Sequence, residues 1–315
     1  MTASTVPVDV RRERWRLRIR NARTFWERFS RRGDGVVGLA ILTMFVVIAL
    51  FPSLFVGPLE TATTSTGGTL EAPSAAHLFG TDELGRDLLN LTLHGATVSM
   101  VIGFLATLIT IFLGGMIGIV AGFVGGRLDS ALMRVTDFFL VLPTFVLALI
   151  LAPIIGDLIG SDAELLGIKA TLLVIVIVIG VTSWASTARI IRSQTLSVKE
   201  RMFIDRARVI GSGSGHIMRR HILPNVTNLI VANTVLTFAG AVFTETTLSF
   251  IGLGDPFQPS WGQILNAAQE AGAPGLGAWW YIVPPAACVV LVILAFTLVG
   301  NALDEILNPK GSGRR

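Results

Sequence analysis

Residues 199–225, KERMFIDRARVIGSGSGHIMRRHILPN, form a polar, basic and glycine-punctuated stretch between two long apolar segments. Lysines and arginines occupy positions 199, 201, 206, 208, 219 and 220. The hydrocarbon of a bilayer cannot hold so many charges, so this stretch must lie outside the membrane on one side. The rest of the chain is therefore organised around it as spans that precede and follow a loop.

The internal pattern of this stretch predicts two short helices joined by an elbow. Residues 197–210 are good helix formers with charge on several faces, and Gly211 supplies the permissive backbone of a helix C-cap or turn. Ser212 or Ser214 can cap a second helix, which Pro224 either stops or follows as the start of the next. Such an elbow presents side chains to a soluble partner; the alternative is a basic loop whose arginines only fix topology.

The segments on either side are apolar enough to cross a membrane. Of the 315 residues, 52% are hydrophobic and only 15% are charged, and the mean hydropathy is +0.69. A span needs about 20 apolar residues, and continuous apolar runs favour helices over a β-barrel. The sequence therefore predicts an all-α polytopic membrane protein with six transmembrane helices. Their cores are expected at 35–55, 97–122, 136–155, 170–190, 226–248 and 282–303.

The distribution of charge sets the orientation of these spans. If the N-terminus is cytoplasmic, the inner segments hold all of the 25 lysines and arginines except Arg86 and Lys169, with Arg189 at a span boundary. The positive-inside rule is then met at every loop, which predicts that both termini are cytoplasmic. The arginines are a topology signal and not a sign of nucleic-acid binding, despite a pI near 10.0.

The first 34 residues contain ten arginines interleaved with aromatic and aliphatic side chains. This pattern predicts an amphipathic helix that lies on membrane lipid at the inner surface. A cleaved signal peptide is not expected, because no small-residue cleavage site follows the apolar run. The expected division is a basic segment 1–34, a first span 35–56, an external loop 57–94, a five-helix core 95–304 that contains the elbow 199–224, and a cytoplasmic tail 305–315.

Several features predict how the spans pack. Pro143 predicts a kink in the third span. A stripe of small residues lets another helix approach closely, either inside this subunit or at a dimer interface. The stripe consists of Gly114, Gly118, Gly122 and Gly126. Charged side chains that could pair across the inner turn are Asp129, Arg134 and Asp137. An aromatic belt at the outer interface is expected from Trp261, Trp279, Trp280 and Tyr281.

The external loop ends in HLFGTDELGRDLLNLTLHGATVSM, residues 77–100, where acidic side chains cluster between glycines. Thr81 or Asp82 can cap a short helix there. The segment resembles the LGTDxLGRDxxSRxxxGxRxSL signature of the C-type permease subunits of dipeptide, oligopeptide and nickel ABC importers. The alternative is an acidic external loop without a specific role. The matching residues are Gly80, Thr81, Asp82, Leu84, Gly85, Arg86, Asp87, Gly95 and Ser99.

The elbow is similar to the EAA loop of the same importers, in which Glu-Ala-Ala is followed by three residues, Gly, nine residues and Ile-x-Leu-Pro. Asp replaces Glu, Arg replaces the first Ala, and His replaces Ile. The resemblance implies that this loop couples the permease to an ATPase subunit. The residues at the matching positions are Asp205, Arg206, Ala207, Gly211, His221, Leu223 and Pro224.

A third stretch, ETTLSFIGLGDPFQPSWGQILNAAQE at residues 245–270, resembles the ETxLSFLGLGxxPPxPSWGxML segment of these permeases. Glu245 lies toward the outer end of a membrane segment, where an ionisable group is a candidate for the transport pathway or a gate. The alternative is a capped or water-facing glutamate that stabilises a re-entrant turn.

Together the three resemblances imply the type I ABC importer permease fold in a bacterial inner membrane. The implied partners are a homologous B-type permease that completes a heterodimer, two ABC ATPase subunits or one fused ATPase, and an external substrate-binding protein. The sequence has no GxxxxGK[ST] phosphate loop, so ATP and Mg²⁺ are expected in the partner ATPase subunits. For this chain we expect no cofactor, no metal site and no catalytic residue.

The expected function is uptake of di- or oligopeptides, and permeases for nickel or glutathione remain open alternatives. An ion-coupled secondary transporter would need charged or polar groups near the midplane, for which only Glu245 and Asp137 are candidates. A membrane-embedded enzyme would need convergent catalytic groups, which the sequence does not reveal.

Overall fold

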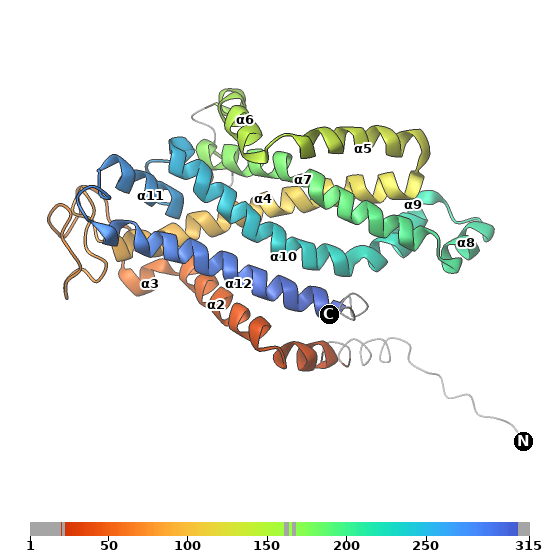
Figure 1. Ribbon diagram of the computed structural model, residues 1–315, viewed down its shortest axis with the longest axis horizontal. Coiled ribbons are helices and arrows are strands. Elements are labelled where there is room, and N and C mark those ends of the chain that lie inside the picture. Colours follow the sequence, from red (N-terminus) through yellow and green to blue (C-terminus); the bar gives the residue numbers. More distant parts are fainter. Residues whose placement is uncertain (1–19, 21–22, 161–163, 166–167, 308–315) are drawn as a thin grey trace, which may run out of the picture.

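The computed structural model describes residues 20, 23–160, 164–165 and 168–307. Most of them belong to helices, and the long helices run side by side along one long axis (Figure 1). A short helix covers residues 23–30. The further elements, in chain order, are α2 (Gly33–Leu50), α3 (Pro52–Val56), α4 (Leu88–Val124), α5 (Gly126–Val141), α6 (Thr144–Ile159), β1 (Glu164–Leu165), β2 (Ile168–Lys169), α7 (Ala170–Lys199), α8 (Met202–Val209), α9 (Ser214–Ile217), the π-helical turn η1 (Met218–Ile222), α10 (Leu223–Leu248), the π-helical turn η2 (Ser249–Leu253), α11 (Trp261–Glu270), the 3₁₀ turn η3 (Trp279–Tyr281) and α12 (Val283–Leu307).

Five helical segments within the described residues are long and apolar enough to cross a membrane, and they contain α2, α4, α7, α10 and α12. A sixth crossing arises only if α5 and α6 are taken together, because these helices meet at 96°. The third span is therefore a broken pair and not one kinked helix over 136–155. Pro143 explains the break, since it disfavours helical backbone at Leu142, which is extended with ψ of 131°. Residues 126–135, which lie between the expected spans 97–122 and 136–155, belong to α5.

Helices α4 and α7 pack closely because glycines remove side chains from their contact. A Cβ atom at Gly114 would lie 2.7 Å from the carbonyl oxygen of Trp184, and one at Gly118 would lie 2.6 Å from that of Ala188. The small-residue stripe thus serves packing inside this chain. Gly126 does not belong to it, because a Cβ atom there would have no neighbour within 4 Å and the residue begins α5.

Two ion pairs tie α5 to α7. Arg192 donates from Nε and Nη2 to the two carboxylate oxygens of Asp129, both at 2.6 Å, and Arg189 pairs with Asp137. The expectation that Asp129, Arg134 and Asp137 would pair across the turn is therefore wrong for both acids. Both point from one helix to the next, where the cations of α7 lie one turn apart.

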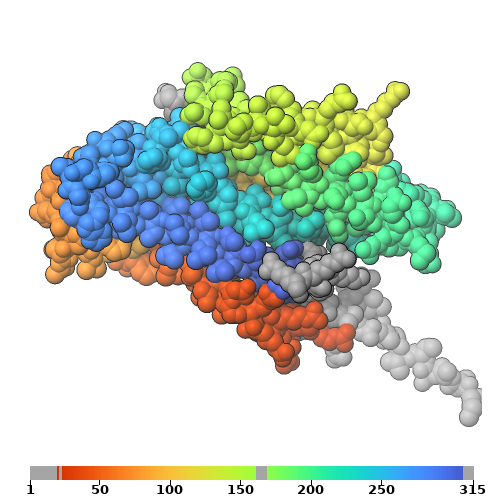
Figure 2. Space-filling model, viewed as in Figure 1, coloured from red at the N-terminus to blue at the C-terminus, as the bar shows by residue number. Residues whose placement is uncertain are grey.

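The segments outside the spans lie at the two ends of the molecule. Residues 57–87 gather with α11 at one end, and α8 and α9 lie at the other (Figures 1 and 2). The two cations expected outside each meet an acid: Arg86 Nε lies 2.6 Å from Asp82, and Lys169 Nζ lies 3.5 Å from Asp255. The predicted amphipathic segment 1–34 falls largely outside the described residues, as does the tail after residue 307.

Candidate functional site

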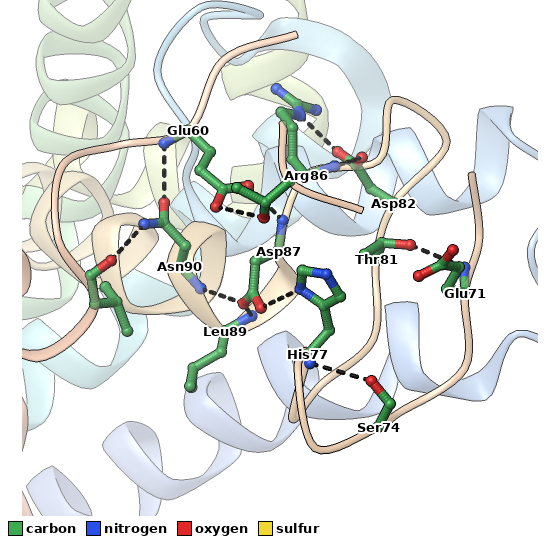
Figure 3. Close-up of polar contacts among 12 residues, drawn as sticks. Glu60, Glu71, Ser74, His77, Thr81, Asp82, Arg86, Asp87, Leu89 and Asn90 are labelled. Atoms are coloured by element: carbon green, nitrogen blue, oxygen red, sulfur yellow. Dashed lines mark hydrogen bonds and ion pairs between the residues drawn. The ribbon is translucent and has the colours of Figure 1, made fainter. Parts of the chain in front are cut away.

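The external motif folds into a compact turn within the loop of residues 57–87, which we call the external cap (Figure 3). Asp82 is fully buried in it. Its carboxylate accepts hydrogen bonds from the backbone N–H of Leu84 at 2.9 Å, the backbone N–H of Arg86 at 2.8 Å and the Arg86 Nε at 2.6 Å. A buried carboxylate with this many donors fixes the backbone around it.

Thr81 connects the motif to an earlier part of the cap. Its buried hydroxyl donates to the carbonyl of Gly68 at 2.6 Å and accepts from the backbone N–H of Glu71 at 2.8 Å. The turn requires positive φ at Gly80 (+70°) and Gly85 (+75°), which only glycine adopts without strain. The glycines of the motif therefore shape the turn while its polar side chains hold it closed.

Asp87 caps the long helix α4 and gathers the rest of the cap around it. One carboxylate oxygen accepts from the backbone N–H of Leu89 at 2.7 Å and of Asn90 at 3.0 Å, and the other lies 2.9 Å from Nδ1 of His77. Its own N–H donates to the carboxylate of Glu60 at 2.7 Å. These contacts join segments that are up to 27 residues apart in the chain (Figure 3).

The helix cap expected at Thr81 or Asp82 is therefore wrong, because α4 begins at Leu88 and Asp87 is its N-cap. Both earlier residues bind backbone within the cap instead. Sequence reasoning also missed His77 and Glu60, since a pattern at helical spacing cannot reveal partners that meet only when the loop folds.

Two of the four residues assigned to an aromatic belt lie in the core, so that assignment is wrong for them. Trp261 is fully buried and its indole N–H donates to the carbonyl of Thr92 at 3.0 Å. Tyr281 is 1% exposed and its hydroxyl donates to Glu83 at 2.5 Å. Both rings have a polar atom that needs a buried partner, and the cap and α4 supply it.

Glu245 is fully buried where α10 passes into η2. The hydroxyl of Ser249 donates to its Oε1 at 2.8 Å. Ser99 of α4 and Ser260, which caps α11, also interact with this carboxylate. The side chain thus connects three elements around the turn that leads to α11.

This geometry favours a capped glutamate that stabilises the re-entrant turn, which leaves the helix at Gly252 with φ of +90°. The water-facing form of that alternative is wrong, because Glu245 has no exposed surface. A pathway or gate role for it stays a prediction. Among the described residues, no group of three or more His, Cys, Asp and Glu side chains is placed to hold a metal ion.

The elbow, residues 199–224, contains the helix–glycine–helix arrangement with shifted boundaries. The preceding span helix α7 continues to Lys199, and α8 is a separate short helix. Gly211, with φ of +88°, donates its N–H to the carbonyl of Arg208 at 2.9 Å, and Ser212 donates to that of Ala207 at 3.0 Å. This glycine-centred pair of bonds closes the C-terminus of α8.

The second helix of the elbow does not end before the next span. From Ser214 the backbone stays helical through η1 into α10, and Pro224 follows one residue after the π-helical turn, where its missing N–H interrupts the regular hydrogen-bond pattern. Leu223 and Pro224 are exposed, and the ring of His221 lies 6.2 Å from that of Phe203.

The side chains of α8 divide into an inner and an outer set. Ile204 is fully buried and Ala207 is 8% exposed, and both pack toward the start of α10. Asp205 and Arg206 face solvent, and Asp205 accepts from Arg208 at 3.1 Å. Large apolar side chains also point outward at this end, namely those of Met202, Val209 and Ile210.

Comparison with known proteins places the chain among transport proteins. Residues 114–312 match the family model described as binding-protein-dependent transport system inner membrane component. The chain is 34% identical over 289 residues to the dipeptide transport system permease protein DppC of Bacillus subtilis (strain 168), with 90% of this chain and 84% of that protein covered.

Two further relatives are also permease proteins of peptide transport systems. The dipeptide transport system permease protein DppC of Alkalihalophilus pseudofirmus is 32% identical over 278 residues, covering 87% of this chain and 85% of that protein. The oligopeptide transport system permease protein OppC of Bacillus subtilis is 31% identical over 285 residues, covering 90% and 88%. With its apolar helices, the chain is a multi-pass protein of the bacterial inner membrane, and it belongs to the family of inner-membrane permease components of binding-protein-dependent transport systems.

Proposed function

We propose that this chain is the C-type permease subunit of an ATP-driven importer of di- or oligopeptides, and that it shares the pathway with a homologous B-type permease. The observation that carries the proposal is its likeness, over 90% of its length, to a dipeptide permease and an oligopeptide permease. The external cap and the elbow lie at opposite ends of the spans, as an importer requires.

The exposed apolar tip of the elbow supports docking of an ATPase on the inner side. Val209 is 88% exposed and Ile210 is 83% exposed, beside the charged Arg206 and Arg208. Apolar side chains that are exposed together within a polar surface are typical of a protein interface. The ATPases, as two subunits or one fused chain, would hold ATP and Mg²⁺, and an external binding protein would deliver the peptide to the cap.

The first experiment is affinity purification of the tagged chain from its native membrane, followed by reconstitution of the complex in proteoliposomes. We expect a second permease and the ATPases to co-elute, and ATP-dependent uptake of a labelled dipeptide when the binding protein is added. Nickel and glutathione are offered in parallel. A chain that elutes alone, or a complex that takes up nickel or glutathione but no peptide, would contradict the proposal.

Replacement of Gly211 tests the coupling role of the elbow. Gly211→Val places a β-branched residue at φ of +88°, which disfavours the turn that closes α8. We expect ATP hydrolysis to continue without peptide uptake while the spans stay inserted. Unchanged uptake per assembled complex would show that the turn is not needed for coupling.

A further inference from the structure

A groove of about 300 Å³ opens among the membrane helices where α5 and α6 break. Seven of its lining side chains carry hydroxyl groups, and none of its lining residues is charged. The hydroxyls come from α4, α6, α7 and α10, so four helices contribute to one polar wall. We call this the hydroxyl groove; its hydroxyl residues are Thr110, Thr144, Thr182, Ser183, Ser186, Thr237 and Thr244.

The groove is exposed, which distinguishes it from ordinary helix packing. Thr144 and Ser186 are exposed, as is the lining residue Gly240. A single exposed hydroxyl on a span is common, because it bonds to its own helix, as Thr43 of α2 does with the carbonyl of Leu39 at 2.8 Å. Five of the seven hydroxyl residues are exposed or half-buried, and Thr110 and Thr182 are buried. The hollow therefore suits water or a polar solute better than lipid.

The hydrogen-bond state of these hydroxyls determines what they can bind. Ser186 donates to the carbonyl of Ser183 at 3.3 Å, and Thr244 donates to that of Gly240 at 2.9 Å. A hydroxyl that donates one hydrogen bond keeps lone pairs, which can accept hydrogen bonds from N–H groups. A peptide main chain offers such groups at every non-proline residue, whatever its side chains are. A wall without charge also does not bind the charged termini of a peptide tightly. Weak binding suits a passage that the transported peptide must leave.

The polar surface continues from the groove along α7 toward the elbow. Ser186, Arg189, Ser193 and Ser197 are exposed at helical spacing, and Arg189 is paired with Asp137 of α5. Because α7 ends at the elbow, this face leads to the inner end of the molecule. An exposed polar face of that length borders water or another subunit and not hydrocarbon.

Toward the outer end the groove is closed by apolar side chains. Ala148, Val178 and Leu248 lie one helical turn outward from the groove hydroxyls of α6, α7 and α10. All three are fully buried and belong to one packed cluster. We call these three residues the outer seal, because a dry, packed layer stops water and solutes.

We propose that the hydroxyl groove and the polar face of α7 form this subunit's inner half of the peptide passage, and that the groove accepts hydrogen bonds from main-chain amides of a peptide in transit. The outer seal keeps the passage closed to the outside in this conformation. The proposal rests on the proposed function and adds the residues that carry the cargo and the part of the peptide they recognise.

Thiol labelling tests whether the groove holds water and cargo. Cys288, the single cysteine, is replaced by Ala, and the complex is assembled with either Ser186→Cys or Thr43→Cys. In inside-out vesicles a charged thiol reagent should modify Ser186→Cys, and a transported dipeptide should slow that reaction. Thr43→Cys, outside the groove, should stay unmodified. Equal labelling of both positions, or labelling at 186 that no peptide slows, would overturn the proposal.

Uptake measurements test the hydroxyls themselves. The triple variant Ser186→Ala, Thr237→Val, Thr244→Val removes three acceptors with little change of volume, and we expect peptide uptake per assembled complex to fall about tenfold. Thr43→Val is the matched control and should transport like the wild type. If the wild type imports peptide and the triple variant imports equally well, this inference is wrong and the proposed function stands. If the wild type imports no peptide, both are wrong.

Discussion

The external cap and the elbow are both polar segments outside the apolar spans, yet they are stabilised in opposite ways. In the cap, Thr81 and Asp82 are fully buried; the Thr81 hydroxyl binds the carbonyl of Gly68, 13 residues away, and the Asp82 carboxylate binds the backbone N–H of Arg86. In the elbow, the charged side chains face solvent and backbone bonds at Gly211 close the turn. The cap therefore depends on the identity of buried polar residues, and the elbow depends on backbone geometry and a small apolar patch.

This difference separates residues that hold structure from residues that are free to recognise a partner. The polar groups of the cap are hydrogen-bonded to one another, so we expect a mutation there to lower the stability of the fold first. The outward side chains of α8 contribute little to the fold of this chain, so we expect a mutation there to weaken its assembly with a partner subunit. Matched changes in the two regions make the difference measurable.

The largest contrast is expected between two glycines with similar backbone geometry. Gly85 has φ of +75°, and a Cβ atom there would lie 2.3 Å from the carbonyl oxygen of Gly67. Gly85→Ala combines the cost of positive φ with a collision against backbone that cannot move freely. We therefore expect the free energy of unfolding to fall by about 3 kcal/mol. A lower midpoint of thermal unfolding in detergent, and faster proteolysis of the cap in intact cells, would show it.

Gly211→Ala is the control for that change. Gly211 has φ of +88°, but no atom lies within 4 Å of the position that a Cβ atom would take, so only the positive-φ cost of about 1 kcal/mol applies. Equal shifts of the unfolding midpoint for the two variants would mean that the cap is no more tightly packed than the elbow.

A smaller contrast is expected between two aspartates. Asp82→Ala removes three hydrogen bonds from a buried site, and we expect the free energy of unfolding to fall by about 2 kcal/mol. Loss of one member of a fully buried ion pair would cost more, but here the remaining partner can reach water. That partner, Arg86, has a side chain that is 21% exposed. The unfolding midpoint and protease sensitivity of the cap measure the effect.

Asp205→Ala provides the comparison in the elbow. The ion pair of Asp205 with Arg208 joins side chains that are 64% and 43% exposed, so its loss should change stability by about 0.5 kcal/mol or less. An Asp205 effect as large as that of Asp82 would show that surface charge stabilises the elbow as strongly as buried polar groups stabilise the cap.

The same contrast explains what the sequence could predict. The apolar segments, their orientation and the glycine turn of the elbow follow from local rules, and Gly211 could be assigned from its neighbours alone. The partner of Asp87 could not, because His77 and Glu60 reach it only after the cap folds. Helix capping rules applied to Thr81 and Asp82 led to the wrong residue, since both were already bound to the loop.

The broken third span and the buried aromatics were missed for related reasons. Pro143 predicts a kink, but a proline signals only that a helix is interrupted and not the size of the bend, which is 96° between α5 and α6. Trp261 and Tyr281 have the composition of an interfacial belt, but their polar atoms are satisfied by Thr92 and Glu83 inside the protein. Tertiary contacts of this kind leave no periodic signal.

The smallest effect on stability, and the sharpest test of the elbow as a recognition surface, is expected for Ile210→Asp. Ile210 is 83% exposed, so a charge there costs the fold of this chain almost nothing, but it would be desolvated against an apolar pocket of an ATPase. Leu78→Asp in the cap is the matched control, since Leu78 is 64% exposed at the other end of the molecule. Both variants should insert and unfold like the wild type, and only Ile210→Asp should lose the co-eluting ATPases. Retention of the ATPases by Ile210→Asp would place their docking surface elsewhere on the inner face.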